Sequence, residues 1–260
     1  MPTLELQFLG TGTSAGVPMI ACECDVCRSD DPRDKRTRCS AVVRDGTTTV
    51  LIDTTPELRL QAVSVGLKHI DAIVYTHGHA DHIMGLDDVR RFNAVRGGPL
   101  DVYADEATAR TLLTCFGYAF KPPTPDSTLF RPHLVHRTIR PDTPFVIGGQ
   151  TWVPIPLVHG NTTVLGFRIG NLAYCTDVNH IPPASWERLA GVEVLVLDAL
   201  QWKKHATHFT VEEAIDVARR LGARETYFTH IAHGLGHAET NRLLPPGMQL
   251  AHDGLVIRCG

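Results

Sequence analysis

The sequence lacks the features of a membrane-spanning or disordered protein. No run approaches the about 18 uninterrupted apolar residues that a membrane helix needs. Only 20% of the 260 residues are charged, which disfavours extensive disorder, and the 43% that are hydrophobic suffice for a large core. The net charge of −3 gives no global attraction for nucleic acid or an anionic membrane. This argues only weakly against polyanion binding, because a local basic groove can still form.

The amino-terminal segment also lacks the pattern of a secretory leader. Leu4 to Leu9 is a strand-like run, without a basic segment followed by an apolar one. We therefore expect a cytoplasmic protein, in which the seven cysteines do not form disulfides. No internal repeat or low-complexity linker divides the chain, so we expect a single domain over residues 1–260. The one irregular tract, Lys121 to Pro132 with four prolines, is predicted as a surface loop rather than a substrate lid.

Short apolar runs alternate with helix-like stretches along the chain. The predicted strands are Val50 to Ile52, Ala72 to Tyr75, Val164 to Phe167, Leu172 to Tyr174 and Val192 to Leu197. The predicted helices are Pro56 to Gly66, Asp105 to Cys115 and Thr210 to Leu221. Thr210 and Glu213 form a capping box at the start of the last helix, and Gly222 ends it. Helices do not separate every pair of strands, which favours two strand-rich halves with helices outside over one doubly wound sheet.

The six-residue segment His77 to His82 (His-Gly-His-Ala-Asp-His) directly follows a predicted strand. In an extended segment, side chains i and i+2 point the same way, so His77 and His79 can bind one metal ion. Asp81 and His82 follow on the next turn and can face a second ion. Imidazole and carboxylate suit Zn, Mn or Fe. Three histidines and one aspartate at this spacing predict a metal centre rather than a polar loop.

Four ligands from one segment cannot complete two metal sites, so further ligands must come from elsewhere. Three candidates follow apolar runs, namely His159, Asp177 and His230. Each alone would be an ordinary loop residue. Ligands at strand ends meet at one rim of a sheet, however, and together these three supply what the first segment lacks.

These residues resemble the metallo-β-lactamase superfamily, whose His-x-His-x-Asp-His signature matches residues 77–82. The resemblance implies an α/β fold, the αββα four-layer sandwich with two mixed β-sheets and helices on the outer faces. It implies a first metal ion on His77, His79 and His159, and a second on Asp81, His82 and His230, with Asp177 bridging both. It also implies that Asp53, which ends a predicted strand, orients a ligand histidine from behind the site.

The charge of such a centre bears on the substrate. Two divalent ions with Asp81, Asp177 and a bridging hydroxide leave a net charge near +1, which favours an anion such as a phosphodiester. Neutral esters and lactones also react at such centres. Some β-lactamases carry cysteine where Asp177 stands, and Cys175, two residues away, would point to the other face. Antibiotic hydrolysis is therefore disfavoured.

A second cluster consists of Cys22, Cys24 and Cys27, whose spacing lets three thiolates share one zinc ion. Free thiols, or a redox pair of Cys24 and Cys27, are the alternatives. A redox pair normally opens a helix after a strand, whereas the segment Asp30 to Pro32 is predicted as loop. The remaining cysteines belong to no motif and are predicted to be small buried residues, namely Cys39, Cys115, Cys175 and Cys259.

The segment Gly10 to Pro18, the three cysteines and Arg38-Cys39-Ser40 resemble one branch of the superfamily, the phosphoribosyl 1,2-cyclic phosphate phosphodiesterases of the carbon–phosphorus lyase pathway. This resemblance runs from the first strand to Asp253-Gly254. It implies that His233 completes a structural zinc site with the cysteines. It also assigns His208 to substrate contact or proton donation, so we expect Asp81 and His208 to act in catalysis. The alternative for His208 is an exposed loop residue, which we predict for His133, His136 and His205.

We therefore expect a phosphodiesterase that hydrolyses a small cyclic phosphate or nucleotide-like phosphodiester. Two divalent ions, Zn or Mn or else Fe, would activate the hydroxide, and one further Zn would be structural. A ribonuclease Z-like nuclease is the first alternative, but such proteins carry a long arm where His159 and Asp177 are only 18 positions apart here. A non-enzymatic biosynthetic carrier is the second, and retention of all seven ligand types argues against it. The expected partner is a small phosphodiester rather than nucleic acid or a membrane, and the resemblance implies a homodimer as often as not.

Overall fold

The structure of the protein is a computed structural model that describes residues 4–122 and 130–259. The choice between a surface loop and a lid for residues 121–132 depends on residues 123–129, which lie outside the described residues. Within the described parts of the chain, no helix is both long enough and apolar enough to cross a membrane.

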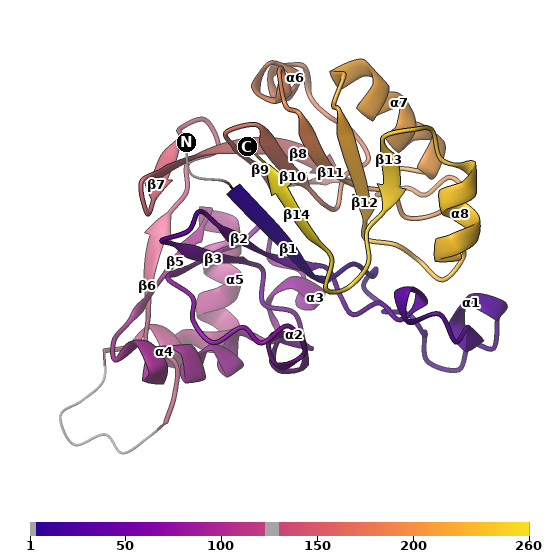
Figure 1. The fold of residues 1–260 in the computed structure, drawn as a ribbon. Helices are drawn as coiled ribbons and strands as arrows, with labels where there is room; N and C mark the ends of the chain where they lie inside the picture. The colour runs from indigo at the N-terminus through magenta and orange to yellow at the C-terminus, as the bar shows by residue number, and fades with distance from the viewer. Residues whose placement is uncertain (1–3, 123–129, 260) are drawn as a thin grey trace.

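The chain forms two seven-stranded mixed sheets that face each other (Figure 1). The first sheet has the strand order β14 (Val256–Cys259), β1 (Leu4–Gly10), β2 (Ser40–Arg44), β3 (Thr49–Ile52), β4 (Ala72–Val74), β5 (Leu100–Ala104) and β6 (Leu134–Thr138). The second has the order β13 (Met248–Leu250), β12 (Glu225–Thr229), β11 (Val194–Asp198), β10 (Leu172–Cys175), β9 (Thr162–Ile169), β8 (Gln150–His159) and β7 (Phe145–Ile147). Strands β3 to β6 run parallel, as do β10 to β13.

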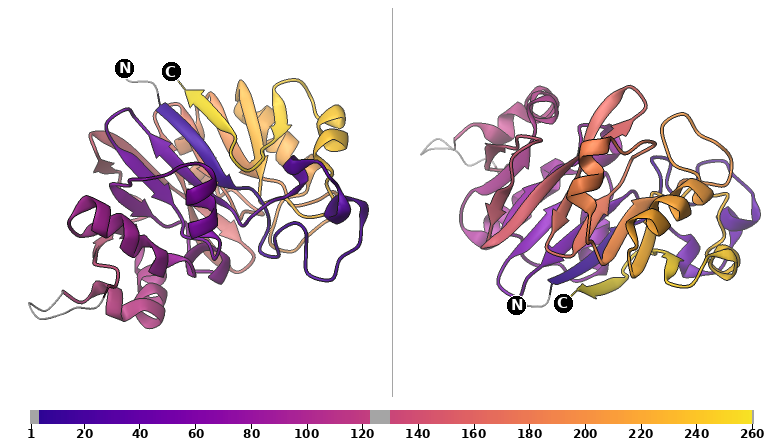
Figure 2. Two further views of the ribbon diagram at one scale, coloured as in Figure 1. Left: turned by 60° about the horizontal axis from the view of Figure 1, so that its bottom comes forward. Right: turned by 90° about the horizontal axis from the view of Figure 1, so that it is seen from above.

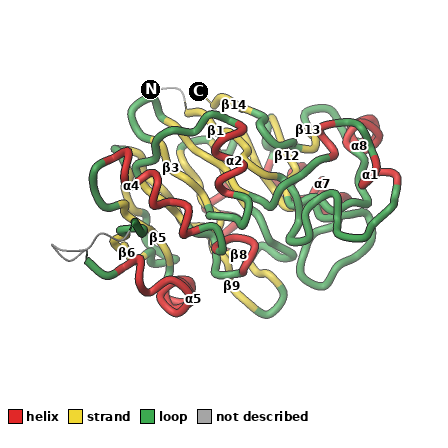
Figure 3. Tube along the Cα trace, turned by 90° about the horizontal axis from the view of Figure 1, so that it is seen from below, coloured by secondary structure: helices red, strands yellow, loops and turns green. Residues whose placement is uncertain are grey.

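Helices cover the outer face of each sheet, as Figures 1 and 2 show. On the first sheet lie α2 (Leu58–Ser64), α4 (Arg90–Arg96) and α5 (Glu106–Phe116), and on the second lie α6 (Pro183–Leu189), α7 (Val211–Leu221) and α8 (His237–Leu243). The short helices are α1 (Asp25–Arg28) and α3 (Ala80–Ile83), with the 3-10 turns η1 (Pro32–Asp34), η2 (Leu86–Val89) and η3 (Gly117–Phe120). Helix α1 belongs to a long excursion between β1 and β2 that reaches toward α8, as Figure 3 also shows from below.

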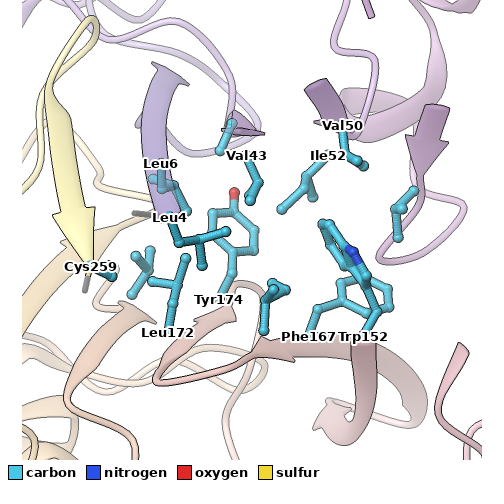
Figure 4. Packing of buried hydrophobic residues seen from close by; sticks show 14 of the residues in the cluster. Leu4, Leu6, Val43, Val50, Ile52, Trp152, Phe167, Leu172, Tyr174 and Cys259 are labelled. Atoms are coloured by element: carbon cyan, nitrogen blue, oxygen red, sulfur yellow. The ribbon is translucent and has the colours of Figure 1, made fainter. Parts of the chain in front are cut away.

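The alternation of side chains along each strand builds three apolar layers. In β11, Val194 and Val196 pack into the central core between the sheets, while Leu195 and Leu197 pack toward the outer helices. In β3, Val50 and Ile52 point to the centre. Successive strand residues point to opposite faces, so a strand that is apolar throughout must be covered on both sides. Figure 4 shows the central layer, where Trp152 and Phe167 pack edge to face.

This architecture confirms the predicted αββα sandwich. The capping box of α7 is present, with the Thr210 hydroxyl accepting from the Glu213 backbone N–H, and Gly222 ends the helix with φ of 68°. The short helix α1 follows Cys24, whereas Asp30 and Asp31 lie in a loop as predicted, and the 3-10 turn η1 begins at Pro32. One prediction about the cysteines was wrong. Cys115 is exposed, because it lies off the face of α5 that buries Leu112 and Phe116.

Candidate metal centre

The seven predicted ligands meet at one rim of the sandwich, where strands of both sheets end. His77 and His79 follow β4, and α3 carries Asp81 and His82. His159 ends β8, Asp177 follows β10 and His230 follows β12. The fold thus brings together side chains that are far apart in the sequence.

The first group contains His77, His79, His159 and Asp177, whose ligand atoms all lie within 4.8 Å of one another. The imidazole rings of His77 and His79 meet edge to face, with centroids 4.4 Å apart. From Asp177 Oδ2 the distance is 3.9 Å to His77 Nε2 and 4.0 Å to His159 Nε2. Three imidazoles and one carboxylate therefore surround one point.

The second group contains Asp81, His82, Asp177 and His230. His82 Nε2 lies 3.4 Å from Asp177 Oδ1 and 3.5 Å from Asp81 Oδ2. His230 Nε2 lies 3.3 Å from Asp177 Oδ2 and 3.9 Å from Asp81 Oδ2. Asp177 belongs to both groups. Its Oδ1 is the oxygen nearer to His82, and its Oδ2 is the one nearer to His77, His159 and His230.

The polar atoms that converge here fit metal ions. The Nε2 atoms of His77, His82 and His230 are buried and have no hydrogen-bond partner among the described residues. Buried polar atoms are almost always hydrogen-bonded, so three unpaired ring nitrogens that face one carboxylate indicate a binding site for a ligand. Ligand atoms about 2.0–2.2 Å from a tetrahedrally coordinated zinc ion lie roughly 3.3–3.6 Å from each other. Several of the separations above fall in or near this range.

The backbone is in the left-handed region at three residues of the rim. Asp53, Asp177 and His230 have φ of 62°, 54° and 59°, and each follows the end of a strand. Aspartate and histidine adopt this conformation more readily than most residues, but it still costs up to about 1–3 kcal/mol per residue. The strain is retained at three of the strand ends that reach the site.

Hydrogen bonds to the distal ring nitrogens orient several candidate ligands. Asp53 Oδ2 accepts from His82 Nδ1 at 2.7 Å and from the Thr76 hydroxyl at 2.7 Å. His159 Nδ1 donates to the backbone carbonyl of Thr207 at 2.8 Å. A donor role for Nδ1 leaves Nε2 as the free lone pair, which is the form that binds a metal ion. Asp53 thus has the contact expected of an orienting residue.

The electrostatics of the rim depend on these carboxylates. Burial lowers the pKa of His77 well below its usual value. Burial also opposes a charge on His82, but the carboxylates of Asp177 and Asp53 outweigh it and raise the pKa of His82. Burial likewise opposes the charge of Asp177, while His230 and His82 hold its pKa well below the usual range. The carboxylates therefore favour positive charge at the rim, which bound cations would supply.

His208 is buried beside this rim, which contradicts the exposed-loop alternative. Its ring stacks on His230 with centroids 4.5 Å apart and meets His159 edge to face at 4.6 Å. Its Nδ1 lies 2.6 Å from Asp198 Oδ2, and Asp198 was not among the predicted site residues. Asp198 is the last residue of an apolar strand and Asp53 directly follows one, and that position was the available signal. Of the other histidines, His205 is exposed as predicted. His133 lies in a loop as predicted but is half-buried, and His136 is half-buried in β6 rather than in a loop.

The cysteine cluster lies on the excursion between β1 and β2. Cys22, Cys24, Cys27 and His233 place their ligand atoms within 4.8 Å of one another. His233 Nδ1 is 3.2 Å from Cys22 Sγ and 3.3 Å from Cys24 Sγ. A hydrogen bond from the Cys27 backbone N–H, together with His233, lowers the pKa of Cys24 to about 6, while burial raises the pKa of Cys27 to about 11. Three thiols and one imidazole in this arrangement match the donor set of a structural zinc site.

A cavity of about 180 Å³ opens beside the first ligand group. The segment from His77 to His79 forms one side of it, and the first half of α5 and the start of β9 form the rest. Four threonines contribute to its lining, namely Thr108, Thr111, Thr162 and Thr163. The space next to the candidate metal centre is therefore small and rich in hydroxyl groups.

Comparison with known proteins agrees with this geometry. The family model described as "Beta-lactamase superfamily domain" matches residues 48–231. A solved structure described as a "New Diphosphatase from the PhnP Family" superposes with a TM-score of 0.92 at 47% identity, covering 99% of this chain and 97% of that one. Its fold is the one that the sequence resemblance predicted.

Two curated relatives have different names. An octanoyltransferase of Porphyromonas gingivalis is 38% identical over 95% of this chain, but the chain spans only about half (50%) of its length. Coenzyme PQQ synthesis protein B of Rhodopseudomonas palustris (strain TIE-1) is 34% identical, covering 98% of this chain and 99% of that protein. The three relatives carry three different functional names, so likeness alone does not assign a substrate.

The shared position of Asp177 leads to a first prediction. Replacing it (Asp177→Ala) removes the carboxylate that belongs to both ligand groups, so the bound metal should fall by at least one ion per chain and hydrolytic activity should be lost. The milder Asp53→Asn keeps one acceptor for His82 and should weaken metal binding about 10–100-fold. Metal-to-protein ratios after dialysis, with circular dichroism to verify folding, measure both effects. A folded Asp177→Ala protein with the full metal complement would disprove the two-ion assignment.

Proposed function

The chain belongs to the β-lactamase superfamily, since the family model covers most of it, and on this premise we propose that it is a metal-dependent phosphodiesterase. The proposed substrate is a small cyclic phosphate or a nucleotide-like phosphodiester. The proposal rests on one observation. The buried Nε2 atoms of His82 and His230 have no hydrogen-bond partner among the described residues, and both lie next to the Asp177 carboxylate. The 47% identical diphosphatase supports phosphate chemistry over the other named activities.

Seven side chains would hold the two catalytic ions. We assign His77, His79 and His159 to one ion, Asp81, His82 and His230 to the other, and Asp177 to both. When bound there, divalent ions would polarise a phosphoryl oxygen and lower the pKa of water, which is the chemistry that two-metal sites supply. The mixed nitrogen and oxygen donors suit Zn, Mn and Fe alike.

We propose that His208 protonates the leaving group. Asp198 accepts a hydrogen bond from His208 Nδ1, which fixes the tautomer and stabilises a positive charge on the ring. The ring contacts two candidate ligands, His159 and His230, with centroids 4.6 Å and 4.5 Å away. An alkoxide leaving from phosphorus needs a proton, and a histidine can supply one near neutral pH.

The rim favours a small substrate over a folded RNA. His159 and Asp177 are joined by the paired strands β9 and β10 and by short turns, so the arm expected of a ribonuclease Z has no place between them. The adjoining cavity of about 180 Å³ is lined by hydroxyl groups, which suit a sugar-like group. Both observations support a small diester.

A non-enzymatic role in biosynthesis is the competing hypothesis. The full-length match to coenzyme PQQ synthesis protein B favours it, because that protein is named for a biosynthetic pathway rather than a reaction. Octanoyl transfer has weaker support, because the chain matches only half of the octanoyltransferase. A carrier needs neither a shared metal-bridging carboxylate nor a histidine placed for proton transfer, and we therefore favour hydrolysis.

Turnover separates these hypotheses. The metal-loaded protein should hydrolyse bis-p-nitrophenyl phosphate and at least one member of a panel of cyclic phosphates and nucleotide diesters. A chelator should abolish turnover, and adding Zn²⁺ or Mn²⁺ back should restore it. The Asp177→Ala protein, prepared in parallel, controls for contaminating phosphodiesterases. A fully metal-loaded protein without activity on any diester of the panel would refute the proposal.

The role of His208 can be tested with two leaving groups. General acid assistance is worth about 10²–10⁴-fold and matters most for a basic leaving group. His208→Ala should therefore slow a diester with an alkyl leaving group by about that factor, but slow release of p-nitrophenolate far less. The measurement is kcat/KM for both substrates at unchanged metal content. Equal slowing of both would show that His208 binds substrate or supports the site without donating a proton.

A further inference from the structure

His230 differs from the other buried candidate ligands in how its ring is held. His82 and His159 use Nδ1 to hydrogen-bond Asp53 and the carbonyl of Thr207, and His77 Nδ1 lies 3.0 Å from the Thr76 hydroxyl. His230 Nδ1 is buried and has no hydrogen-bond partner among the residues that the structure describes. Its ring stacks between His82 and His208, with centroids 6.2 Å and 4.5 Å away. Stacking fixes the plane of a ring but leaves it free to slide.

The backbone must therefore place His230. The residue has φ of 59°, a conformation that histidine keeps only when its surroundings impose it. On its C-terminal side, the Ile231 N–H donates to the Thr11 carbonyl at 2.8 Å, and the Ile231 carbonyl accepts from Thr13 N–H at 3.2 Å. The excursion between β1 and β2 thus contacts the chain directly after His230.

Arg36, on the same excursion, holds the next part of this segment. Its guanidinium is fully buried, at 1% exposure, and donates to the carbonyls of Ala232 at 3.2 Å and Leu235 at 2.6 Å. It also donates to Asp34 Oδ1 at 2.9 Å, and the same oxygen accepts from the His237 backbone N–H at 2.8 Å. Two side chains of the excursion therefore bind three backbone groups of residues 232–237.

Arginine suits this position because its planar group presents several donors in fixed directions, whereas lysine presents one compact charge. Burial lowers the pKa of Arg36, and Asp34 is the nearest opposing charge. A buried guanidinium that donates to one carboxylate and three carbonyls is far more constrained than a surface ion pair. The pair formed by Asp34 and Arg36 is thus a rigid link between the excursion and residues 232–237.

We propose that Arg36 is a positioning residue for His230. By fixing residues 232–237, the link holds His230 in its left-handed conformation and aims Nε2 at Asp81 and Asp177. The same segment carries His233, so one link sets the approach of this chain to both the catalytic rim and the cysteine cluster. The inference rests on the proposed assignment of His230 to the second metal ion, but not on any particular substrate.

The test is a titration of the full chain with Mn²⁺, which oxygen and nitrogen ligands bind and thiolates do not favour. The parent protein should bind two Mn²⁺, and the electron paramagnetic resonance spectrum should show coupling between them. Arg36→Met keeps the length of the side chain but removes every donor. It should bind the first Mn²⁺ like the parent and the second about 10–100-fold more weakly, as loss of an orienting partner typically does. The coupled spectrum should then appear only at higher Mn²⁺ concentration.

Arg33→Met is the matched control, because Arg33 lies on the same excursion but pairs with Asp31 at the surface. Its second Mn²⁺ should bind as in the parent. Arg36→Lys retains the charge and should fall between the parent and Arg36→Met, and it replaces Arg36→Met if that protein does not fold. If a folded Arg36 variant binds the second Mn²⁺ with an affinity within twofold of the parent's, the positioning role of Arg36 is refuted while the two-ion centre stands. A parent that binds a single Mn²⁺ would instead refute the proposed two-ion centre.

Discussion

The carboxylate of Asp177 is buried among imidazoles, and most features of the rim follow from neutralising and orienting that charge. A carboxylate loses its hydration when it is buried, so it must be surrounded by positive groups or by cations. His82 and His230 lie within 3.4 Å of its oxygens, and His77 and His159 stand 3.9 Å and 4.0 Å away. Protons can partly balance this cluster, whereas two divalent ions satisfy both the charge and the unpaired ring nitrogens.

The two-sheet architecture makes such a cluster possible. Strands that are apolar on both faces remain buried up to their last residue, so polar side chains at their ends meet at one rim. The chain turns there at three residues in the left-handed conformation, namely Asp53, Asp177 and His230. Asp198 is the last residue of β11. The outer helices stabilise the strands without closing the rim. The excursion between β1 and β2 supports the chain that follows His230.

The parts of this arrangement that depend on local periodicity could be predicted from the sequence. The spacing of two residues between His77 and His79 predicted that they face the same way. The apolar runs predicted the strand ends that carry the more distant ligands. Interactions that depend on tertiary contacts were not predictable. Arg36 lies in a charged stretch with no signal of burial, and the role of Asp198 depends on a histidine ten positions later. The exposure of Cys115 is set by the face of α5 on which it lies, and the residue type alone does not indicate that face.

The assignment of the rim depends on two metal ions that share Asp177. Anomalous diffraction from crystals of the purified protein, recorded on both sides of the zinc and manganese absorption edges, locates these ions. Two peaks should appear about 3.5–4 Å apart on either side of the Asp177 carboxylate. A third, zinc-specific peak should lie about 2.3 Å from the sulfur atoms of Cys22, Cys24 and Cys27. A metal-replete crystal with a single peak, or none, at Asp177 would show that this residue does not bridge two ions.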